Sequence, residues 1–185
     1  KLVDQIITNF PFINTYNFPR KFTSPSISRP RDLFAYFGTS YKRESISYQR
    51  KKIKEKLYGK ISVEKVPRWK YFKEIHQSKL VISPFGWGEF ALRDYETFMA
   101  GALLLKPNMD HLETYPNFYQ DNKTMISHRW DLSNLEDKLD WASSNKKLSE
   151  EISINGQEFY RTHSYTIKGK EMFTNYFSKL IYKII

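Results

Sequence analysis

The chain has 185 residues, which suits one domain of ordinary size and excludes a large multidomain machine within this sequence. It carries 30 Lys and Arg against 20 Asp and Glu, a formal charge of +10 that favours an anionic partner such as phosphate, nucleic acid or a membrane surface. Hydrophobic residues make up 40% of the chain, which argues against disorder, and the lack of cysteine excludes disulfides, zinc ribbons, iron–sulfur sites and thiol nucleophiles.

The sequence contains no recognisable membrane-spanning run and begins with no recognisable targeting segment. No apolar run reaches the roughly 18 to 20 residues that cross a bilayer, and residues 1–4 begin no secretory segment. We therefore expect a cytoplasmic protein with at most peripheral contact to a membrane. Because the first residue is Lys1 rather than Met, we also expect a processed or excised piece of a longer chain.

The first half of the chain alternates between predicted strands and helices. Residues 1–31 hold four of the eight prolines and no clear period, so we expect an irregular arm or linker there. The apolar run 32–37 predicts a buried strand, 48–58 predicts a helix with a basic outer face, and the alternation over 60–66 predicts a second strand. Pro67 then opens a further predicted helix.

The second half continues this alternation. The apolar run 80–82 predicts a third strand, 89–100 an amphipathic helix closed by Gly101, 102–105 a fourth buried strand, and 124–127 a fifth. Helical periods then cover residues 134–144, 146–161 and 170–182.

This order predicts an α/β fold, a Rossmann-like doubly wound parallel sheet, because parallel neighbours need a crossover helix. Residues 32–163 would form the domain, and residues 164–185 a C-terminal helix that packs on it. Ligands of such sheets bind outside the carboxyl ends of the strands, so the chemistry is expected in the loops 38–43, 66–68 and 83–89.

The third of these loops reads Ser83-Pro84-Phe85-Gly86-Trp87-Gly88-Glu89. Its two glycines let the backbone approach a ligand, and free amides at the start of the next helix suit a phosphate. An ordinary tight turn that needs glycine for a positive φ is the alternative interpretation.

The predicted helix after this loop carries a polar strip. Glu89, Arg93 and Glu96 stand at i, i+4 and i+7 and would share one face. Arg93 would then meet a diphosphate, and Glu96 would accept hydrogen bonds from ribose or sugar hydroxyls. The alternative is a pair of intrahelical salt bridges worth roughly 0.3 to 0.5 kcal/mol each.

Three segments in this region form a recognisable set. They are the glycine-bearing loop, then Arg93-Asp94-Tyr95-Glu96, then Gly101-Ala102-Leu103-Leu104-Leu105-Lys106-Pro107. Together they resemble the carboxyl-terminal, donor-binding half of GT-B glycosyltransferases, closest to bacterial and viral family 1-like enzymes and more loosely to exostosin-type enzymes. The resemblance is concentrated in residues 80–131, including 108–113 and 130–131.

The resemblance implies a single GT-B-type half and an enzyme that transfers a hexosyl or pentosyl group from a UDP- or GDP-linked sugar to a glycan or lipid-linked acceptor. It implies no metal and no further cofactor. The acceptor side of such enzymes belongs to an N-terminal half, which would be a missing partner of this chain. Glu96 would take the ribose role in the family's paired-glutamate signature, whose first position falls on Gly88, so that Glu89 stands one residue late.

Similar enzymes also bind the diphosphate with the loop after the first strand, here residues 38–43, although an ordinary polar turn before a basic helix is the alternative. The nucleobase would lie against residues 66–68. The expected donor-binding residues are Gly38, Thr39, Ser40, Arg43, Arg68, Pro84, Gly86, Trp87, Gly88, Glu89, Arg93 and Glu96.

The catalytic acid or base is left unassigned, with Glu89 and His111 as candidates. A lone histidine is more often a surface or capping residue, and the other histidines have no companions at metal-ligand spacing, so we expect no metal site. Two other functions stay open: a basic nucleic-acid-binding module, which the +10 charge would suit, and a non-catalytic interaction domain. We expect no nucleic-acid partner, because the basic run at 50–52 suits a solvated helix face.

Overall fold

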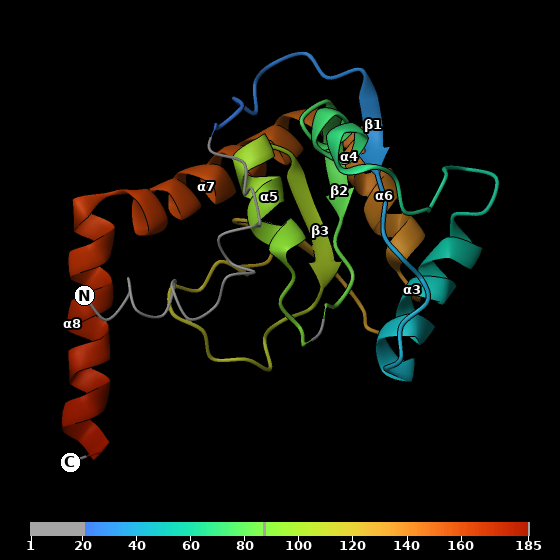
Figure 1. The fold of residues 1–185 in the computed structure, drawn as a ribbon. Coiled ribbons are helices and arrows are strands. Elements are labelled where there is room, and N and C mark those ends of the chain that lie inside the picture. Colours follow the sequence, from blue (N-terminus) through green and yellow to red (C-terminus); the bar gives the residue numbers. More distant parts are fainter. Residues whose placement is uncertain (1–20, 87, 185) are drawn as a thin grey trace.

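The structure is a computed structural model that describes residues 21–86 and 88–184 (Figure 1). Its centre is a parallel sheet of four strands in the order β1-β2-β3-β4. The strands are β1 (Arg31–Phe34), β2 (Ser78–Ile82), β3 (Leu103–Pro107) and β4 (Ile126–His128). β3 is buried along its whole length, as expected for a strand whose sheet is covered on both faces.

Six helices surround this sheet in the described part of the chain. They are α3 (Glu44–Lys56), α4 (Arg68–Ile75), α5 (Leu92–Ala100), α6 (Leu135–Ser144), α7 (Lys146–Tyr165) and α8 (Ile167–Ile184). α3 and α6 pack with Leu80 and Ile82 of β2 in one core cluster, whereas α4 and α5 pack with Val81 in another. Successive β2 side chains therefore face opposite layers, which confirms the predicted Rossmann-like α/β fold.

The strand predicted over residues 60–66 is absent, and this prediction is wrong. The segment is an irregular connection from α3 to α4, which Figure 1 shows on the outer side of β1. Ile61 packs against the core cluster that includes α3 and Val63 is buried in it, whereas Ser62 and Glu64 are exposed. An extended connection that alternately buries its side chains gives the same period of two as a strand, so the pattern alone did not distinguish them.

Helix α5 begins at Leu92, three residues later than predicted. The Asp94 carboxylate accepts a hydrogen bond from the backbone N–H of Ala91 at 3.1 Å, which caps the helix from inside. The helix ends as predicted at Gly101, which has a left-handed φ of 67°. The loop from β2 to α5 is therefore longer than expected, and Glu89 lies in the loop rather than on the helix.

The described chain begins with an irregular segment that is anchored near the end of α5, and it ends with the two long helices α7 and α8. Residues 21–30 form neither helix nor strand, and Arg29 anchors them through hydrogen bonds to the carbonyls of His76 (2.8 Å) and Ala100 (2.6 Å). α7 extends to Tyr165, and α8 turns away from its end (Figure 1). Within the described residues, no helix combines the length and apolar character needed to span a bilayer.

Candidate functional site

A cleft of about 920 Å³ opens at the carboxyl ends of β1 and β2. Three chain segments form it: residues 36–41 after β1, residues 65–72 at the start of α4, and residues 86–96 leading into α5. Arg50 of α3 joins them. The volume falls in the range of about 300 to 1,000 Å³ that small-molecule and cofactor sites occupy, and the position is the one expected for a Rossmann-like sheet.

Half of the expected donor-binding residues line this cleft. Those that do are Gly38, Ser40, Arg68, Gly86, Arg93 and Glu96. Those that the structure leaves off the lining are Thr39, Arg43, Pro84, Gly88 and Glu89. Trp87 lies outside the described residues.

Arg93, in the first turn of α5, is held against the floor of the cleft. Its Nη2 donates to the carbonyl of Tyr36 at 2.7 Å and its Nε to the hydroxyl of Tyr71 at 3.2 Å. The guanidinium also lies 5.5 Å from the ring centroid of Phe37, within cation–π range. These contacts fix a permanent cation between the ends of β1 and β2.

Glu96 lies one turn further along α5 and is 2% exposed, so burial of its carboxylate requires hydrogen-bond donors. One donor is the hydroxyl of Tyr71, at 2.6 Å. Burial raises the pKa of Tyr71 well above its usual value, and the positive charge of Arg93 opposes that shift. Tyr71 therefore stays a protonated donor, and the Arg93–Tyr71–Glu96 group presents a cation and a carboxylate to one cleft.

Arg50 also belongs to the site, although the basic run at 50–52 had indicated a solvated helix face. Arg50 is 6% exposed, and its Nη2 donates to the carbonyl of Phe85 at 2.8 Å while its Nη1 donates to that of Gly38 at 3.2 Å. It thereby ties the loop after β1 to the loop after β2, and burial lowers its pKa. The signal was present in the sequence, because Arg50 stands three residues before the buried Ile53 and so shares its face of α3.

A second unforeseen group lies behind the glycine-bearing loop. The carboxylate of Asp94 is fully buried, accepts hydrogen bonds from Ser83 Oγ (2.5 Å) and the Tyr119 hydroxyl (2.9 Å), and forms an ion pair with Lys106 Nζ (3.1 Å). Burial lowers the pKa of Lys106, and Asp94 opposes that shift. Asp94 therefore joins β3, α5, the first residue after β2 and the segment around Tyr119 at one point, which holds the loop between β2 and α5 in place.

The glycines of this loop have different roles. A Cβ on Gly86 would lie 2.3 Å from the carbonyl oxygen of Phe90, so glycine is required where the loop folds back on itself. A Cβ on Gly88 would meet nothing within 4 Å. The expected free amides at the helix start are not found at Ala91, whose N–H is used by Asp94. Among the described residues of this motif, Gly86 lines the cleft, and glycine is needed there because of contacts within the protein.

The two acid–base candidates lie together, away from the cleft lining. His111 Nε2 is 3.8 Å from Glu89 Oε1, and the imidazole packs edge-on against Trp130 at a centroid distance of 4.7 Å. His76 Nδ1 accepts or donates a hydrogen bond with Thr23 Oγ1, and His163 Nδ1 donates one to the carbonyl of Phe159. In the part of the chain that the structure describes, no three His, Asp or Glu side chains are grouped so as to hold a metal ion.

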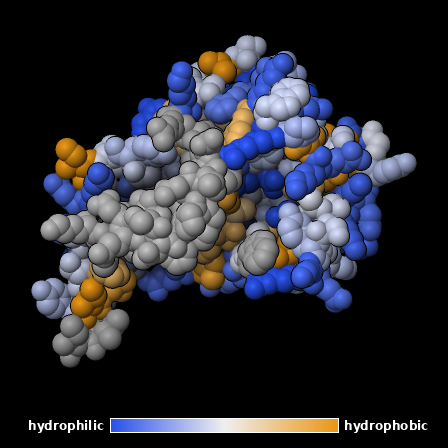
Figure 2. Space-filling model, in the orientation of Figure 1, coloured by the Kyte–Doolittle hydropathy of each residue, from blue (hydrophilic) through white to orange (hydrophobic). Residues whose placement is uncertain are grey.

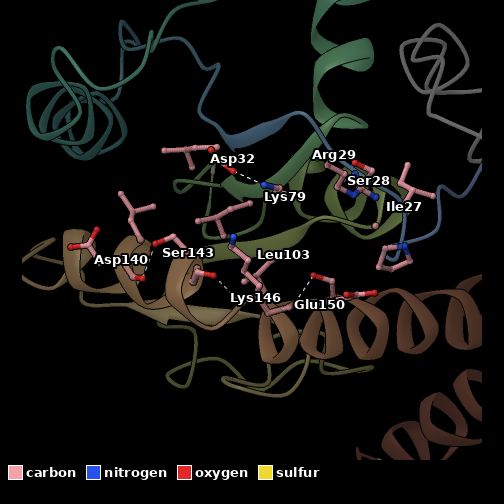
Figure 3. Close-up of a pocket in the computed structure, with 18 residues that line it drawn as sticks. Ile27, Ser28, Arg29, Asp32, Lys79, Leu103, Asp140, Ser143, Lys146 and Glu150 are labelled. Carbon is pink, nitrogen blue, oxygen red and sulfur yellow. Dashed lines mark hydrogen bonds and ion pairs between the residues drawn. The ribbon is translucent and has the colours of Figure 1, made fainter.

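A second cavity, of about 680 Å³, lies at the opposite, amino-terminal edge of the sheet. Figure 3 shows its lining side chains, which come from the starts of the strands and from α6 and α7, with Lys79 paired to Asp32 at 2.7 Å. Its labelled polar side chains are of both charges, including Asp140, Lys146 and Glu150. It holds none of the expected donor-binding residues.

Comparison with known proteins yields structural likeness without sequence likeness. The chain matches no protein-family model and no curated protein. It is similar in structure to the C-terminal domain of LpcC, a glycosyl transferase group 1 family protein from Francisella tularensis, at 13% identity and a TM-score of 0.45 over 82% of this chain and 94% of that one.

It is also similar to Alr3699/HepE of Anabaena, whose structure was solved in complex with UDP-glucose. That likeness has 9% identity and a TM-score of 0.48, and covers 95% of this chain and 53% of HepE. The chain therefore spans about half the length of HepE. At these identities the similarity concerns the fold.

Proposed function

We propose that this chain is the donor-binding part of a glycosyltransferase of the GT-B type, and that its cleft binds the nucleotide of a nucleotide-sugar. The observation that carries the proposal is the joint placement of Arg50, Arg93, Arg68 and the buried Glu96 around one cleft at the carboxyl ends of β1 and β2. Three guanidinium groups suit a ligand with two linked phosphates, because charge-assisted hydrogen bonds to phosphate are strong and often bidentate.

The remaining surface of the cleft suits a nucleoside. Glu96 offers carboxylate oxygens to the ribose hydroxyls, and it is positioned by Tyr71 rather than by solvent. Pro67, Phe72 and Arg68 form an apolar and cationic wall, with the Arg68 guanidinium 5.4 Å from the ring centroid of Phe72. A planar base would lie against this wall, which corresponds to the expected place for the nucleobase.

In this proposal the arginines also serve the chemical step. When the glycosidic bond to the donor breaks, the leaving diphosphate gains negative charge, and fixed cations in a partly buried cleft stabilise that charge without a metal. The transferred group would be a hexose or pentose, UDP- or GDP-linked, and the acceptor a glycan or a lipid-linked sugar. The acceptor and the catalytic base would come from a second half outside this chain.

Calorimetric titration with UDP, GDP and their sugar conjugates tests the proposal. We expect binding of at least one of them, and at least a tenfold weaker affinity for Arg93→Gln, because a hydrogen bond to a charged group contributes about 1.5 to 3 kcal/mol. Arg68→Gln, at an exposed position, should weaken binding in the same direction. Arg129→Gln makes the same chemical change at an exposed site off the cleft and should leave the affinity unchanged.

The same titration distinguishes the other functions. If none of these nucleotides binds at millimolar concentration to the folded chain, the proposal is wrong. Tight oligonucleotide binding that falls steeply with salt, in place of nucleotide affinity, would instead assign a nucleic-acid-binding module. Nucleotide binding that survives both arginine substitutions would show that the ligand occupies another part of the molecule.

A further inference from the structure

Helix α8 carries an apolar face that the described part of the chain covers only in part. Its members stand at i, i+4, i+7 and i+8 and so share one side of the helix. They are Phe173, Phe177, Leu180 and Ile181, with exposed fractions of 51%, 52%, 38% and 40%. The rings of Phe173 and Phe177 lie parallel at a centroid distance of 6.1 Å, which makes them a continuous surface.

The helix is attached to the body through a different side. Gly169 is buried against the end of α7, where a Cβ would lie 2.3 Å from the carbonyl oxygen of Thr162. Further along, Tyr176 stacks on Tyr115 with a centroid distance of 3.8 Å and an angle of 8°, and Phe173, at the edge of the apolar face, lies 6.5 Å from the same ring. Figure 1 shows α8 extending from the end of α7 past the other elements. A flat surface could therefore reach the apolar face without contacting the sheet.

The charges of α8 fit an anionic surface. The helix contains four lysines and a single glutamate, Glu171, in a chain whose formal charge is +10. Lys170 stands three residues before Phe173 and so shares the side of the apolar face, whereas Lys168 and Lys179 are exposed on the far side of the helix. Figure 2 shows hydrophobic atoms gathered at the lower left, over the end of α8, with hydrophilic atoms beside them. An apolar face of aromatic and aliphatic side chains on a helix with an excess of lysine is typical of helices that lie in a membrane interface.

The size of the face argues against a stable protein interface. Four side chains that are about half exposed offer roughly 300 to 400 Å² of apolar surface, given about 150 to 250 Å² for a whole aromatic side chain. A standard protein–protein interface buries about 800 Å² on each partner. A membrane needs no such matched area, because the lysines add electrostatic attraction to the insertion of the rings.

We propose that α8 lies on an anionic phospholipid surface, with Phe173 and Phe177 inserted among the headgroups and Lys170 at the level of the phosphates. This anchoring site is separate from the nucleotide cleft and does not depend on it. It would hold the protein at the membrane surface without a spanning segment.

Co-sedimentation with vesicles tests this, using the full 185-residue chain. On vesicles of equal parts phosphatidylglycerol and phosphatidylcholine, we expect Phe173→Ser/Phe177→Ser to lower the partition coefficient at least tenfold. Lys170→Glu should also lower it, and 0.5 M salt should weaken binding of the unaltered chain, since screening shortens the reach of surface charges. Tyr182→Ser is the matched control, because Tyr182 is 82% exposed and lies on the opposite side of α8.

Circular dichroism and the nucleotide titration, carried out on each variant, show whether the fold and cleft are intact, so loss of membrane binding is distinguishable from failure of the proposed function. Equal binding to pure phosphatidylcholine and to anionic vesicles would overturn the proposal, as would an unchanged partition of the double phenylalanine variant. A dimer in sedimentation velocity that this variant dissolves would assign the face to a second copy of the chain and would equally overturn it.

Discussion

Arg50, Arg93 and Lys106 place three cationic side chains close to one another around the start of α5. Burial is the main reason that the pKa of Arg50 and of Lys106 is lowered, and the charge of Arg93 lowers both further. Asp94 and Glu96 are the buried carboxylates on the same helix. An anionic ligand in the cleft would relieve this mutual repulsion, which is why single residues of this group should affect both stability and binding.

Asp94 should be the most costly residue of this group to replace. Asp94→Asn removes the ion-pair partner of Lys106 and leaves a buried, unpaired charge, so we expect a loss of about 3 to 5 kcal/mol in the free energy of unfolding. The double variant Asp94→Asn/Lys106→Met removes that charge as well and should be more stable than Asp94→Asn alone. Urea unfolding followed by circular dichroism measures both. Simple additivity of the two single substitutions would contradict the ion pair as the cause.

His128 should make the stability of the protein fall in mild acid. Burial lowers its pKa from 6.5 to about 4, so the unfolded chain takes up a proton at a higher pH than the folded chain. The stability that the neutral imidazole contributes is present above pH 6.5 and is lost as the pH falls toward 4, by about 2 to 3 kcal/mol.

Urea unfolding of the wild-type chain and of His128→Asn, at pH 7 and pH 4.5, measures this effect. The asparagine amide can still donate toward the carbonyl of Arg129, which is 2.8 Å from His128 Nδ1, but it takes up no proton. We expect the pH-dependent loss to be smaller in the variant by about 2 kcal/mol. Equal losses in both chains would mean that other groups cause the acid sensitivity.

At the scale of elements, α5 and its two ends decide the geometry of the cleft. Asp94 caps its start and Gly101 ends it in a left-handed conformation against the 21–30 segment, where a Cβ would lie 2.3 Å from the carbonyl oxygen of Thr23. The helix therefore cannot slide along its axis without breaking buried contacts, and Arg93 and Glu96 keep their places.

Gly101→Ala and Gly59→Ala separate backbone strain from crowding. Both glycines have a positive φ, 67° and 76°, which costs an alanine about 1 to 2 kcal/mol. A Cβ at Gly59 meets nothing within 4 Å, whereas one at Gly101 clashes with backbone. We expect Gly101→Ala to lose clearly more unfolding free energy than Gly59→Ala in thermal or urea denaturation. Equal losses would show that the 21–30 segment yields at little cost.

The sequence predicted elements well where burial and period agree. The runs at 80–82 and 102–105 are strands because both faces are covered, and Pro67 does precede α4. The prediction over 60–66 was wrong because a segment can bury alternate side chains without pairing to a neighbouring strand. The start of α5 was misplaced because its cap, Asp94, is an internal side chain whose role depends on Ser83 and Tyr119.

For the whole molecule, the cleft and α8 face different partners. The cleft collects residues from 36–41, 65–72 and 86–96, which are separated in the chain and meet only because β1 and β2 are parallel neighbours. Helix α8 contacts the body through α7 and Tyr115 and leaves its apolar face exposed. In the two proposals, one end of the molecule holds a soluble anionic ligand and the other an anionic surface.

The sequence by itself determined the layers of this protein, because hydrophobic period, glycine and proline placement act locally along the chain. It also pointed to Arg93 and Glu96 as neighbours, since a spacing of three on a helix fixes their common side. Only the tertiary structure decided that Arg50 turns inward to join two loops, and that Asp94 pairs with Lys106. Those contacts link residues 35 and 12 positions apart, and their free energy depends on burial that no local pattern records.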